Sequence, residues 1–430
     1  MPDVVLVDAT FMLHTLHGLP RTMGDVSTMI LTLLCKMGKV VHFVCDVYST
    51  PSIKDMERAK RGEDGRTYNI TGRDQKAPSS SQWQDALRSR NFKSTLFRFL
   101  AIDWQRDDHS NVIKNHEVFI GFDSRCLSFT EDNGCVVVKN QTRYDCSHEE
   151  ADTRLVYHMI TSHGDENTRS YIVRSNDTDV LLLLVYHVAI QNTANVWMDA
   201  GLDGNNTRRY INVSSLSNAL GSKISSAILG LHSFTGCDYT GAFYRKGKTR
   251  ALDILLKNED YIEAFGKIGN MPEVPEKVTR TIEKFVCHLY SKQQCDSVNN
   301  ARYQMFVDKY KPDKRNQGPL IKIKGVSPSS LPPCRSVLEQ KIRRTNYVVM
   351  LWKRADEKDP VQLNPEDHGW TISGGQYEVD WFKGNQLPES VVDLLTSLDD
   401  NDEEVDTYSG AESDSDNEDD VKSGEDEECS

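Results

Sequence analysis

The acidic residues with the most distinctive placement are aspartates that stand where short apolar runs end. Asp8 and Asp46 each close such a run near the N-terminus, and Asp177 and Asp179 follow a third run. Ligands of an open parallel sheet bind outside the carboxyl ends of its strands. If these runs are parallel strands, the four carboxylates gather at one edge of a sheet.

Three more acidic residues extend this set. Glu150 and Asp152 stand at the predicted start of a helix, and Asp238 lies in the sequence Gly-Cys-Asp-Tyr. Seven carboxylates close together repel one another and raise one another's pKa values unless cations balance them. Mg²⁺ and Mn²⁺ are hard ions that prefer oxygen ligands, and a pair of them can promote phosphodiester cleavage. The set therefore predicts two divalent metal ions, Mg²⁺ or Mn²⁺, and a phosphodiesterase.

Each acidic residue taken singly also has an ordinary structural interpretation. An aspartate between a strand and a helix often caps the helix, which is the alternative for Asp177. The spacing from Ser147 to Glu150 matches a capping box. The hypothesis of a metal site depends on the whole set and its order along the chain.

Apolar runs alternate with segments of helical periodicity, which is typical of βαβ units and a parallel sheet. We predict an α/β fold, with a parallel sheet flanked by helices on both faces. The expected strands cover residues 4–8, 40–45, 117–122, 170–174 and 195–198, and the expected helices cover 25–37, 147–161 and 178–190.

The acidic residues occur in an order that resembles the flap-endonuclease family of structure-specific 5′ nucleases, which have a PIN-like domain. Five stretches carry the resemblance: Val-Leu-Val-Asp8-Ala, Phe43-Val-Cys-Asp46 with Lys54 and Ala59-Lys60-Arg61 after it, Glu150-Ala151-Asp152, Asp177-Thr178-Asp179, and Gly236-Cys237-Asp238-Tyr239. The resemblance implies a metal-dependent endo- or exonuclease that acts on DNA or RNA, with DNA favoured, in the nucleus or cytoplasm, with the nucleus favoured. It also implies that Lys54 and Arg61 contact the scissile phosphate and stabilise its developing charge.

The same resemblance implies a helix-hairpin-helix-like region over residues 239–252, where Lys246, Gly247, Lys248 and Arg250 would bind nucleic acid. Two departures from the family pattern favour another hypothesis. The usual Gly-x-Gly hairpin is absent, and so is the N-terminal Met-Gly segment. The alternative is a catalytically inactive nucleic-acid-binding or scaffold protein that retains the nuclease fold. A protein-interaction adaptor is a third hypothesis.

The expected domains follow from this pattern. The PIN-like domain covers 1–260, with an insertion over 62–116 at the position of the family's gateway above the site. A helical extension (261–310), a linker (311–333), a small module (334–398) and a disordered acidic tail (399–430) follow. Through Leu331-Pro-Pro-Cys334, Asn346-Tyr-Val and Asp367-His-Gly-Trp370, the module resembles the same region of uncharacterised animal proteins of mobile-element type.

The insertion contains a basic and aromatic stretch with two interpretations. Phe92, Leu96 and Phe99 have the spacing of a helix core face, and we favour this interpretation. The alternative is a basic, stacking surface for a single strand. It would consist of Arg88, Arg90, Lys93, Arg98, Trp83, Phe92 and Phe97.

Composition adds further limits. No stretch of 18 apolar residues exists, so we expect no membrane span, and the N-terminus shows no signal peptide pattern. The 10 cysteines are scattered singly, and a zinc site from Cys126, Cys135, Cys146 and His148 has no familiar spacing. The net charge is −13, but the segment 399–430 alone carries −15, so the rest is near neutral at +2. The tail could bind a basic protein partner, and a solubilising role is favoured.

Overall fold

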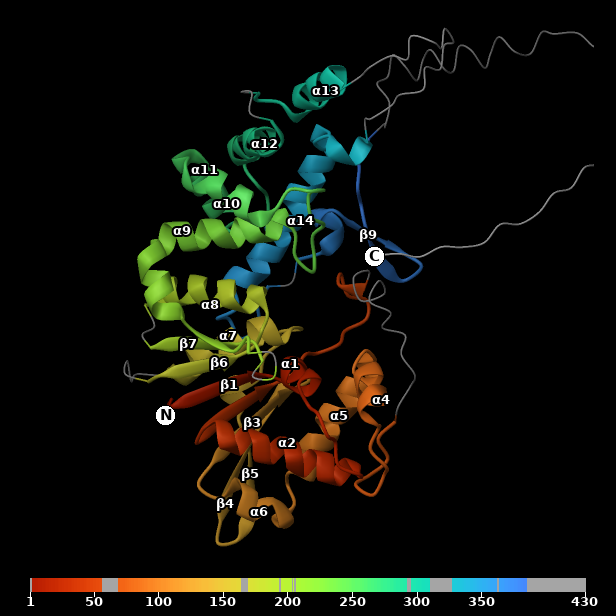
Figure 1. Ribbon diagram of the computed structural model, residues 1–430, viewed down its shortest axis with the longest axis vertical. Helices are drawn as coiled ribbons and strands as arrows, with labels where there is room; N and C mark the ends of the chain where they lie inside the picture. The colour runs from red at the N-terminus through yellow and green to blue at the C-terminus, as the bar shows by residue number, and fades with distance from the viewer. Residues whose placement is uncertain are drawn as a thin grey trace, which may run out of the picture. The chain divides into compact units, whose positions relative to one another are not determined.

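A mostly parallel sheet organises the described part of the chain (Figure 1). The computed structural model describes residues 2–55, 69–163, 169–192, 195–202, 204, 206–291, 295–309, 327–361 and 363–384. Its strands are β1 (Val4–Asp8), β2 (Val40–Val44), β3 (Glu117–Phe122), β4 (Arg125–Asp132), β5 (Cys135–Asn140), β6 (Tyr171–Arg174), β7 (Val196–Ala200) and β8 (Arg209–Asn212). They follow the order β5-β4-β3-β2-β1-β6-β7-β8. The central strands β3, β2, β1, β6 and β7 pair in parallel, whereas the outer strands β4, β5 and β8 pair with their neighbours in an antiparallel manner.

Strand β1 is buried on both faces, and its side chains alternate between two hydrophobic cores. Val4 and Leu6 pack on one side of the sheet, whereas Val5 and Val7 pack on the other. Strands that are buried on both sides read as continuous apolar runs. The predicted α/β fold with helices on both faces is therefore confirmed.

Two sets of helices form these cores with the sheet. The first contains α1 (Ala9–His14), α2 (Met23–Met37), α4 (Ser80–Ala86), α5 (Arg90–Asp103) and α6 (Ser110–Ile113), and the second contains α7 (Ala151–His163) and α8 (Thr178–Gln191). The predicted strands and helices agree with these bounds to within a few residues. Helix α7 begins at Ala151 rather than at Ser147, because another carboxylate caps it, as described below.

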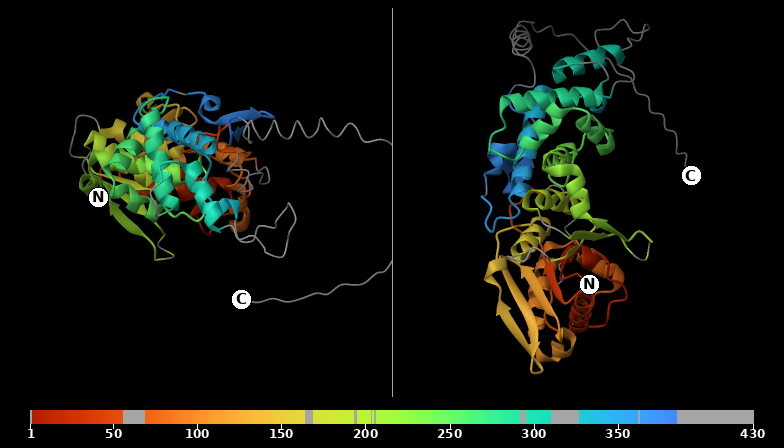
Figure 2. Two further views of the ribbon diagram at one scale, coloured as in Figure 1. Left: turned by 90° about the horizontal axis from the view of Figure 1, so that it is seen from above. Right: turned by 90° about the vertical axis from the view of Figure 1, so that its left-hand side faces the viewer.

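A further group of helices packs on α8 and extends the second core. These are α9 (Val213–Thr235), α10 (Lys248–Leu256), α11 (Glu259–Lys267), α12 (Glu276–Tyr290), α13 (Val298–Lys309) and α14 (Arg335–Lys353). Figure 2 shows α9 to α12 in green above the sheet and α14 in blue beside them. Leu338, Val348 and Trp352 of α14 belong to the same core as Val4 and Leu6. Part of the segment expected as a separate small module thus shares a core with the sheet.

The rest of the expected module begins with the turn η5 (Pro365–His368) and the hairpin β9 (Trp370–Ser373) and β10 (Gln376–Val379). The described helices and strands form one unit, Met1–Lys383. Residues 311–326 of the expected linker, and the expected acidic tail, lie outside the described residues.

The insertion expected over 62–116 is described from Asn69 onward, and it contributes to the first core. Trp83, Phe92, Phe97 and Leu96 are each at most 2% exposed. The favoured interpretation, a helix core face, is confirmed for Phe92 and Leu96, and Phe99 is half-buried against the same core. The alternative of a stacking surface is wrong for these aromatic rings, because burial against α2 and the sheet removes them from any ligand.

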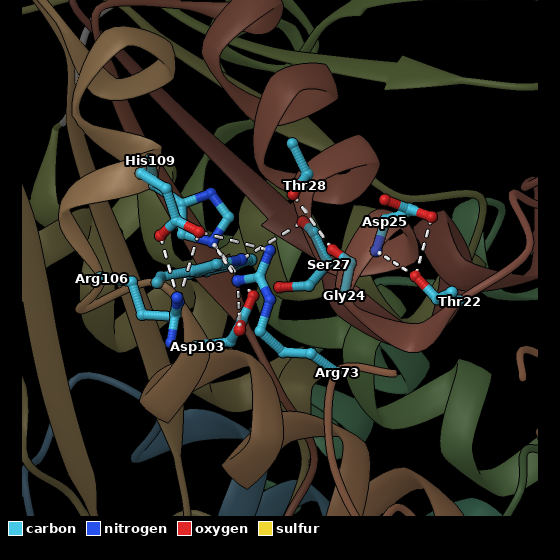
Figure 3. A network of polar contacts seen from close by, with 11 residues as sticks. Thr22, Gly24, Asp25, Ser27, Thr28, Arg73, Asp103, Arg106 and His109 are labelled. Carbon is cyan, nitrogen blue, oxygen red and sulfur yellow. Dashed lines mark hydrogen bonds and ion pairs between the residues drawn. The ribbon is translucent and has the colours of Figure 1, made fainter. Parts of the chain in front are cut away.

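A polar network fastens this insertion to α2 (Figure 3). Arg73 Nη1 donates to Asp103 Oδ1 at 2.7 Å, and His109 Nε2 lies 3.0 Å from Asp103 Oδ2. The backbone N–H of Gly24 donates to the Arg73 carbonyl at 2.9 Å, and a Cβ on Gly24 would lie 2.9 Å from the Arg73 side chain. A glycine therefore allows the two segments to approach this closely.

Candidate active site

The strand order changes direction beside β1. The chain passes from β1 to β2 and β3 on one side and returns to β6 on the other side of β1. Such a reversal opens a crevice at the carboxyl ends of the parallel strands. Asp8 is the last residue of β1, and Asp177 follows β6. The topology thus places the first of the seven predicted carboxylates at the edge where parallel α/β sheets bind ligands.

Asp8 is buried and accepts two hydrogen bonds. Its Oδ1 accepts from the backbone N–H of Phe11 at 3.0 Å, so it caps α1, and its Oδ2 accepts from the Ser175 hydroxyl at 3.0 Å. Burial, and then the nearby charge of Asp46, raises the pKa of Asp8 to about 7. The two hydrogen bonds lower the pKa, but they do not compensate for the loss of water and the like charge.

Asp46 links β2 to α7 and accepts several hydrogen bonds. Its Oδ1 accepts from the backbone N–H of Ala151 at 2.9 Å, and its Oδ2 accepts from the Thr10 hydroxyl at 2.7 Å. Burial would raise the pKa of Asp46, but Lys93 and these donors together hold it below its ordinary value. Asp46 therefore caps α7 from a distant part of the chain.

Lys54 lies among acidic residues at the start of α7 and in the segment after α9. Its ammonium pairs with the Glu150 carboxylate, lies 3.8 Å from Asp238 Oδ2 and sits 4.5 Å from the centre of the Tyr239 ring. Burial would lower the pKa of Lys54, but Glu150, Asp152 and Asp238 outweigh it and raise the pKa. The Glu150 side chain faces Lys54, so the predicted capping box with Ser147 is not formed.

The negative charge of the cluster still exceeds the positive charge that Lys54 supplies. Burial, and then the charges of Glu150 and Asp177, raises the pKa of Asp152 well above its ordinary value. Loss of surrounding water and the charge of Asp179 raise the pKa of Asp177. Burial also raises the pKa of Glu150, although Lys54 opposes it. Crowded carboxylates with raised pKa values are common at functional sites.

Asp177 also has the structural role that its sequence position allowed. Its Oδ1 accepts from the backbone N–H of Asp179 at 2.8 Å, and it caps α8. The capping interpretation of Asp177 is confirmed. Capping by Asp8, Asp46 and Asp177 uses one carboxylate oxygen of each on a helix, so helix formation itself draws these side chains to the same edge.

A chain of three polar side chains begins at Asp179. The Oδ1 of Asp179 lies 2.6 Å from His232 Nε2, and His232 Nδ1 lies 2.8 Å from Lys248 Nζ. An ammonium can only donate, so Nδ1 of His232 accepts and its Nε2–H donates to Asp179. Partial loss of surrounding water lowers the pKa of Lys248, although Asp179 opposes this effect. His232 thus connects the acidic edge to the first turn of α10.

The seven predicted carboxylates lie near enough to influence one another's ionisation. The interactions join Asp8 to Asp46, Asp152 and Asp177, and they join Asp177 to Asp179 and Asp238. Within the described ranges, however, no group of three or more His, Cys, Asp or Glu side chains is arranged tightly enough to hold a metal ion. The donor chemistry suits hard cations, and Glu150 Oε2 is buried without a hydrogen-bond partner in the described part of the chain. Side-chain rotation and displacement of Lys54 would be needed for binding.

The other predicted site residues fall into two groups. Arg61 lies outside the described residues. Gly247 is the N-cap of α10, Lys248 and Arg250 are exposed in its first turn, and Lys246 lies 4.4 Å from the centre of the Tyr290 ring. The four predicted nucleic-acid-binding residues thus cluster at one helix start, and their role stays a prediction.

The sequence alone did not indicate three residues of this site. Thr10, Ser175 and His232 bond to the acidic side chains, but nothing in their spacing distinguishes them from ordinary helix and loop residues. Lys93, which interacts with Asp46, was considered only as part of a basic surface. Contacts between distant segments carry no local signal in a sequence.

No model of a known protein family matches this chain, and no curated protein matches its sequence. Among the described residues, no helix combines the length and the apolar character that a membrane span requires.

Proposed function

We propose that this chain is a divalent-metal-dependent phosphodiesterase with a PIN-like domain, which cleaves structured nucleic acid, DNA rather than RNA. The observation that carries this proposal is the meeting of seven carboxylates at the switch point of a parallel sheet, with Lys54 among them. Structural ion pairs would need fewer acidic groups, because excess buried carboxylates oppose folding unless a ligand balances them.

Asp8, Asp46, Glu150, Asp152, Asp177, Asp179 and Asp238 would hold two Mg²⁺ or Mn²⁺ ions. Bound ions of this kind lower the pKa of water and stabilise charge on phosphate oxygens. Lys54 then has a defined task on this chain. Its ammonium pairs with Glu150 and Asp238 in the structure, and it would form an ion pair with a phosphate oxygen of the bound strand instead. Its buried position favours strong interaction with that anion.

Lys248 and the start of α10 would contact a second phosphate of the same strand. The His232 ring fixes the Lys248 ammonium relative to Asp179. The same proposal includes nucleic-acid binding by Lys246, Gly247, Lys248 and Arg250 and contact of Arg61 with the scissile phosphate. It also includes a basic protein partner for the acidic tail and a nuclear location.

The test is cleavage of labelled flap, hairpin and single-stranded DNA and RNA with Mg²⁺, Mn²⁺ or EDTA. Wild type should cut in a metal-dependent manner, and Asp179→Ala should abolish cutting while circular dichroism shows an intact fold. A matched control is Asp253→Ala on α10, since Asp253 is not among the seven carboxylates. Equal cutting by Asp179→Ala and wild type would reject the site. Binding without cutting by wild type would instead indicate an inactive binding protein.

A further inference from the structure

Asp179, His232 and Lys248 form a row of polar side chains at the edge of the acidic site. Asp179 lies in the first turn of α8, His232 lies in the last turn of α9, and Lys248 is the first residue of α10. His232 Nε2 lies 2.6 Å from Asp179 Oδ1, and His232 Nδ1 lies 2.8 Å from Lys248 Nζ. The imidazole ring therefore stands between a carboxylate and an ammonium that belong to different helices.

The members of this row differ in how much water surrounds them. Asp179 and His232 are buried, at 9% and 7% exposed, whereas Lys248 is exposed. Helices α8 and α9 pack directly against each other, and this packing holds the buried pair in place. Lys248 can therefore change its partner while the carboxylate and the imidazole ring keep their positions.

In the geometry of the structure, Lys248 supplies positive charge to Asp179. Its ammonium also lies 3.4 Å from His232 Nε2, the nitrogen that bonds to Asp179, so the charge stays close to the carboxylate. Opposite charges attract more strongly where water is partly excluded. A lysine held in this way must give up part of that attraction before it can bind a phosphate.

A divalent cation at Asp179 would change this balance. Such an ion is often the largest local charge in a site, and it would replace the positive charge that Lys248 supplies. It would also repel the nearby ammonium, which would then bind a phosphate more readily. Cation binding and phosphate binding would favour each other, because a coupling between two sites acts in both directions.

We infer that His232 is a positioning residue that makes phosphate binding by Lys248 conditional on a divalent cation at Asp179. The ring holds the ammonium beside the carboxylate until a cation replaces it. Arg250 lies in the same turn of α10, but among the described residues His232 bonds to Lys248 and not to Arg250. The inference rests on the proposed function, which supplies both the cation and the phosphate.

The test measures binding rather than cleavage. A labelled single-stranded DNA of about ten nucleotides is titrated with protein by fluorescence anisotropy, once in EDTA and once in Ca²⁺. Ca²⁺ is a hard cation that carboxylate oxygens bind, and gel electrophoresis verifies that the DNA stays intact. Lys248→Gln should weaken binding by about tenfold in Ca²⁺ but by at most about twofold in EDTA, where His232 and Asp179 already hold the ammonium.

Arg250→Gln is the matched control, because it removes one positive charge from the same turn of α10. It should weaken binding by the same factor in Ca²⁺ and in EDTA, since His232 does not hold Arg250. A general effect of Ca²⁺ on the charge of the site or of the DNA would instead change the contribution of both residues.

Two variants of His232 assign the effect to the ring. His232→Phe keeps an aromatic ring beside Trp352, whose centroid lies 6.1 Å away, but it cannot bond to Asp179 or Lys248. In this background Lys248→Gln should weaken binding equally in Ca²⁺ and in EDTA. His232→Gln retains an N–H donor for Asp179 and an acceptor for Lys248, so it should restore the dependence on Ca²⁺. Circular dichroism checks each fold, and the comparison of Lys248→Gln with Arg250→Gln decides the matter if His232→Phe does not fold.

The outcomes separate this inference from the proposed function. An equal loss for Lys248→Gln in Ca²⁺ and EDTA would overturn the inference even if the protein cleaves nucleic acid. A dependence on Ca²⁺ that Arg250→Gln shares, that persists in His232→Phe or that is missing in His232→Gln would overturn it as well. Failure of the wild type to bind DNA in either condition would reject the inference together with the proposed function. A dependence on Ca²⁺ that needs Lys248 and His232, in a protein that never cleaves, would support the inference and reject catalysis.

Discussion

The polar network of Arg73, Asp103 and His109 and the acidic site both take charged side chains out of water, but they balance charge differently. Burial would raise the pKa of Asp103, yet His109, Ser27 and Arg73 together hold it below its ordinary value. Burial and neighbouring carboxylates instead raise the pKa of Asp8 to about 7. A buried carboxylate that has enough hydrogen-bond donors and cations around it holds segments of the chain together. A buried carboxylate that has too few of them destabilises the folded protein unless a bound ligand supplies the missing positive charge.

Among the variants that test this difference, Asp152→Asn should change the cleavage rate most. Removal of one carboxylate from the crowded site should lower metal-dependent cleavage by about 100-fold or more, because a ligand of the proposed metal ions is lost. The same change should leave the metal-free protein as stable as wild type or more stable, since repulsion from Glu150 and Asp177 is relieved. Cleavage rates and urea unfolding in EDTA check both effects. A variant that is less stable and fully active would contradict the comparison.

Asp103→Asn should have the opposite outcome. The change leaves Arg73 and His109 without their carboxylate, and it should lower the free energy of unfolding by about 2 kcal/mol. This value is below that of a fully buried pair, because Arg73 is 30% exposed at its side chain. Cleavage at a temperature well below unfolding should stay unchanged. A loss of activity without a loss of stability would show that the network acts on the site.

A third effect concerns the pH dependence of the free energy of unfolding in EDTA. The folded protein binds a proton at Asp8 between the ordinary pKa of 3.8 and about 7, so stability falls as pH rises through this window. Asp8→Asn should therefore reduce the slope with which the free energy of unfolding falls with pH, by roughly 1 kcal/mol per pH unit where that slope is largest. Asp103 has a lowered pKa, so it stabilises the folded state above its unfolded pKa and loses this contribution as pH falls.

Asp103→Asn should consequently reduce the loss of stability in acid, and Asp8→Asn should reduce the loss toward neutral pH. Urea unfolding of the two variants and wild type at a series of pH values measures both differences. If the pH dependence of the free energy of unfolding changed in the same direction in both variants, the Asp103 network and the acidic site would not differ in how their charges are balanced.

Much of the architecture could be predicted from the chain alone, because local signals specify it. Apolar runs such as Val4–Asp8 and Val40–Val44 read as buried parallel strands, and each was recovered nearly to the residue. The start of α7 was misplaced for a physical reason. The sequence offered Ser147 and Glu150 as a local cap, but Asp46, which follows β2, supplies the cap and Glu150 pairs with Lys54.

The acidic set was the part of the site that the sequence could indicate, since an aspartate at the end of an apolar run is visible locally. Its partners were not visible. His232 bonds to Asp179 across 53 residues, and Ser175 bonds to Asp8 across 167 residues. Such pairs depend on how helices and strands pack, and packing depends on all the segments together.

By itself the sequence therefore determined the order of strands and helices, the seven carboxylates and their approach to one edge. Periodicity and strand ends depend on neighbouring residues, so they can be recognised in the sequence without knowledge of the fold. Only the tertiary structure decided that Lys54 faces Glu150, that Trp352 approaches Tyr239, and that α14 shares a core with β1. These contacts join segments separated by a hundred residues or more in most cases, and only burial of apolar surface on folding brings such segments together.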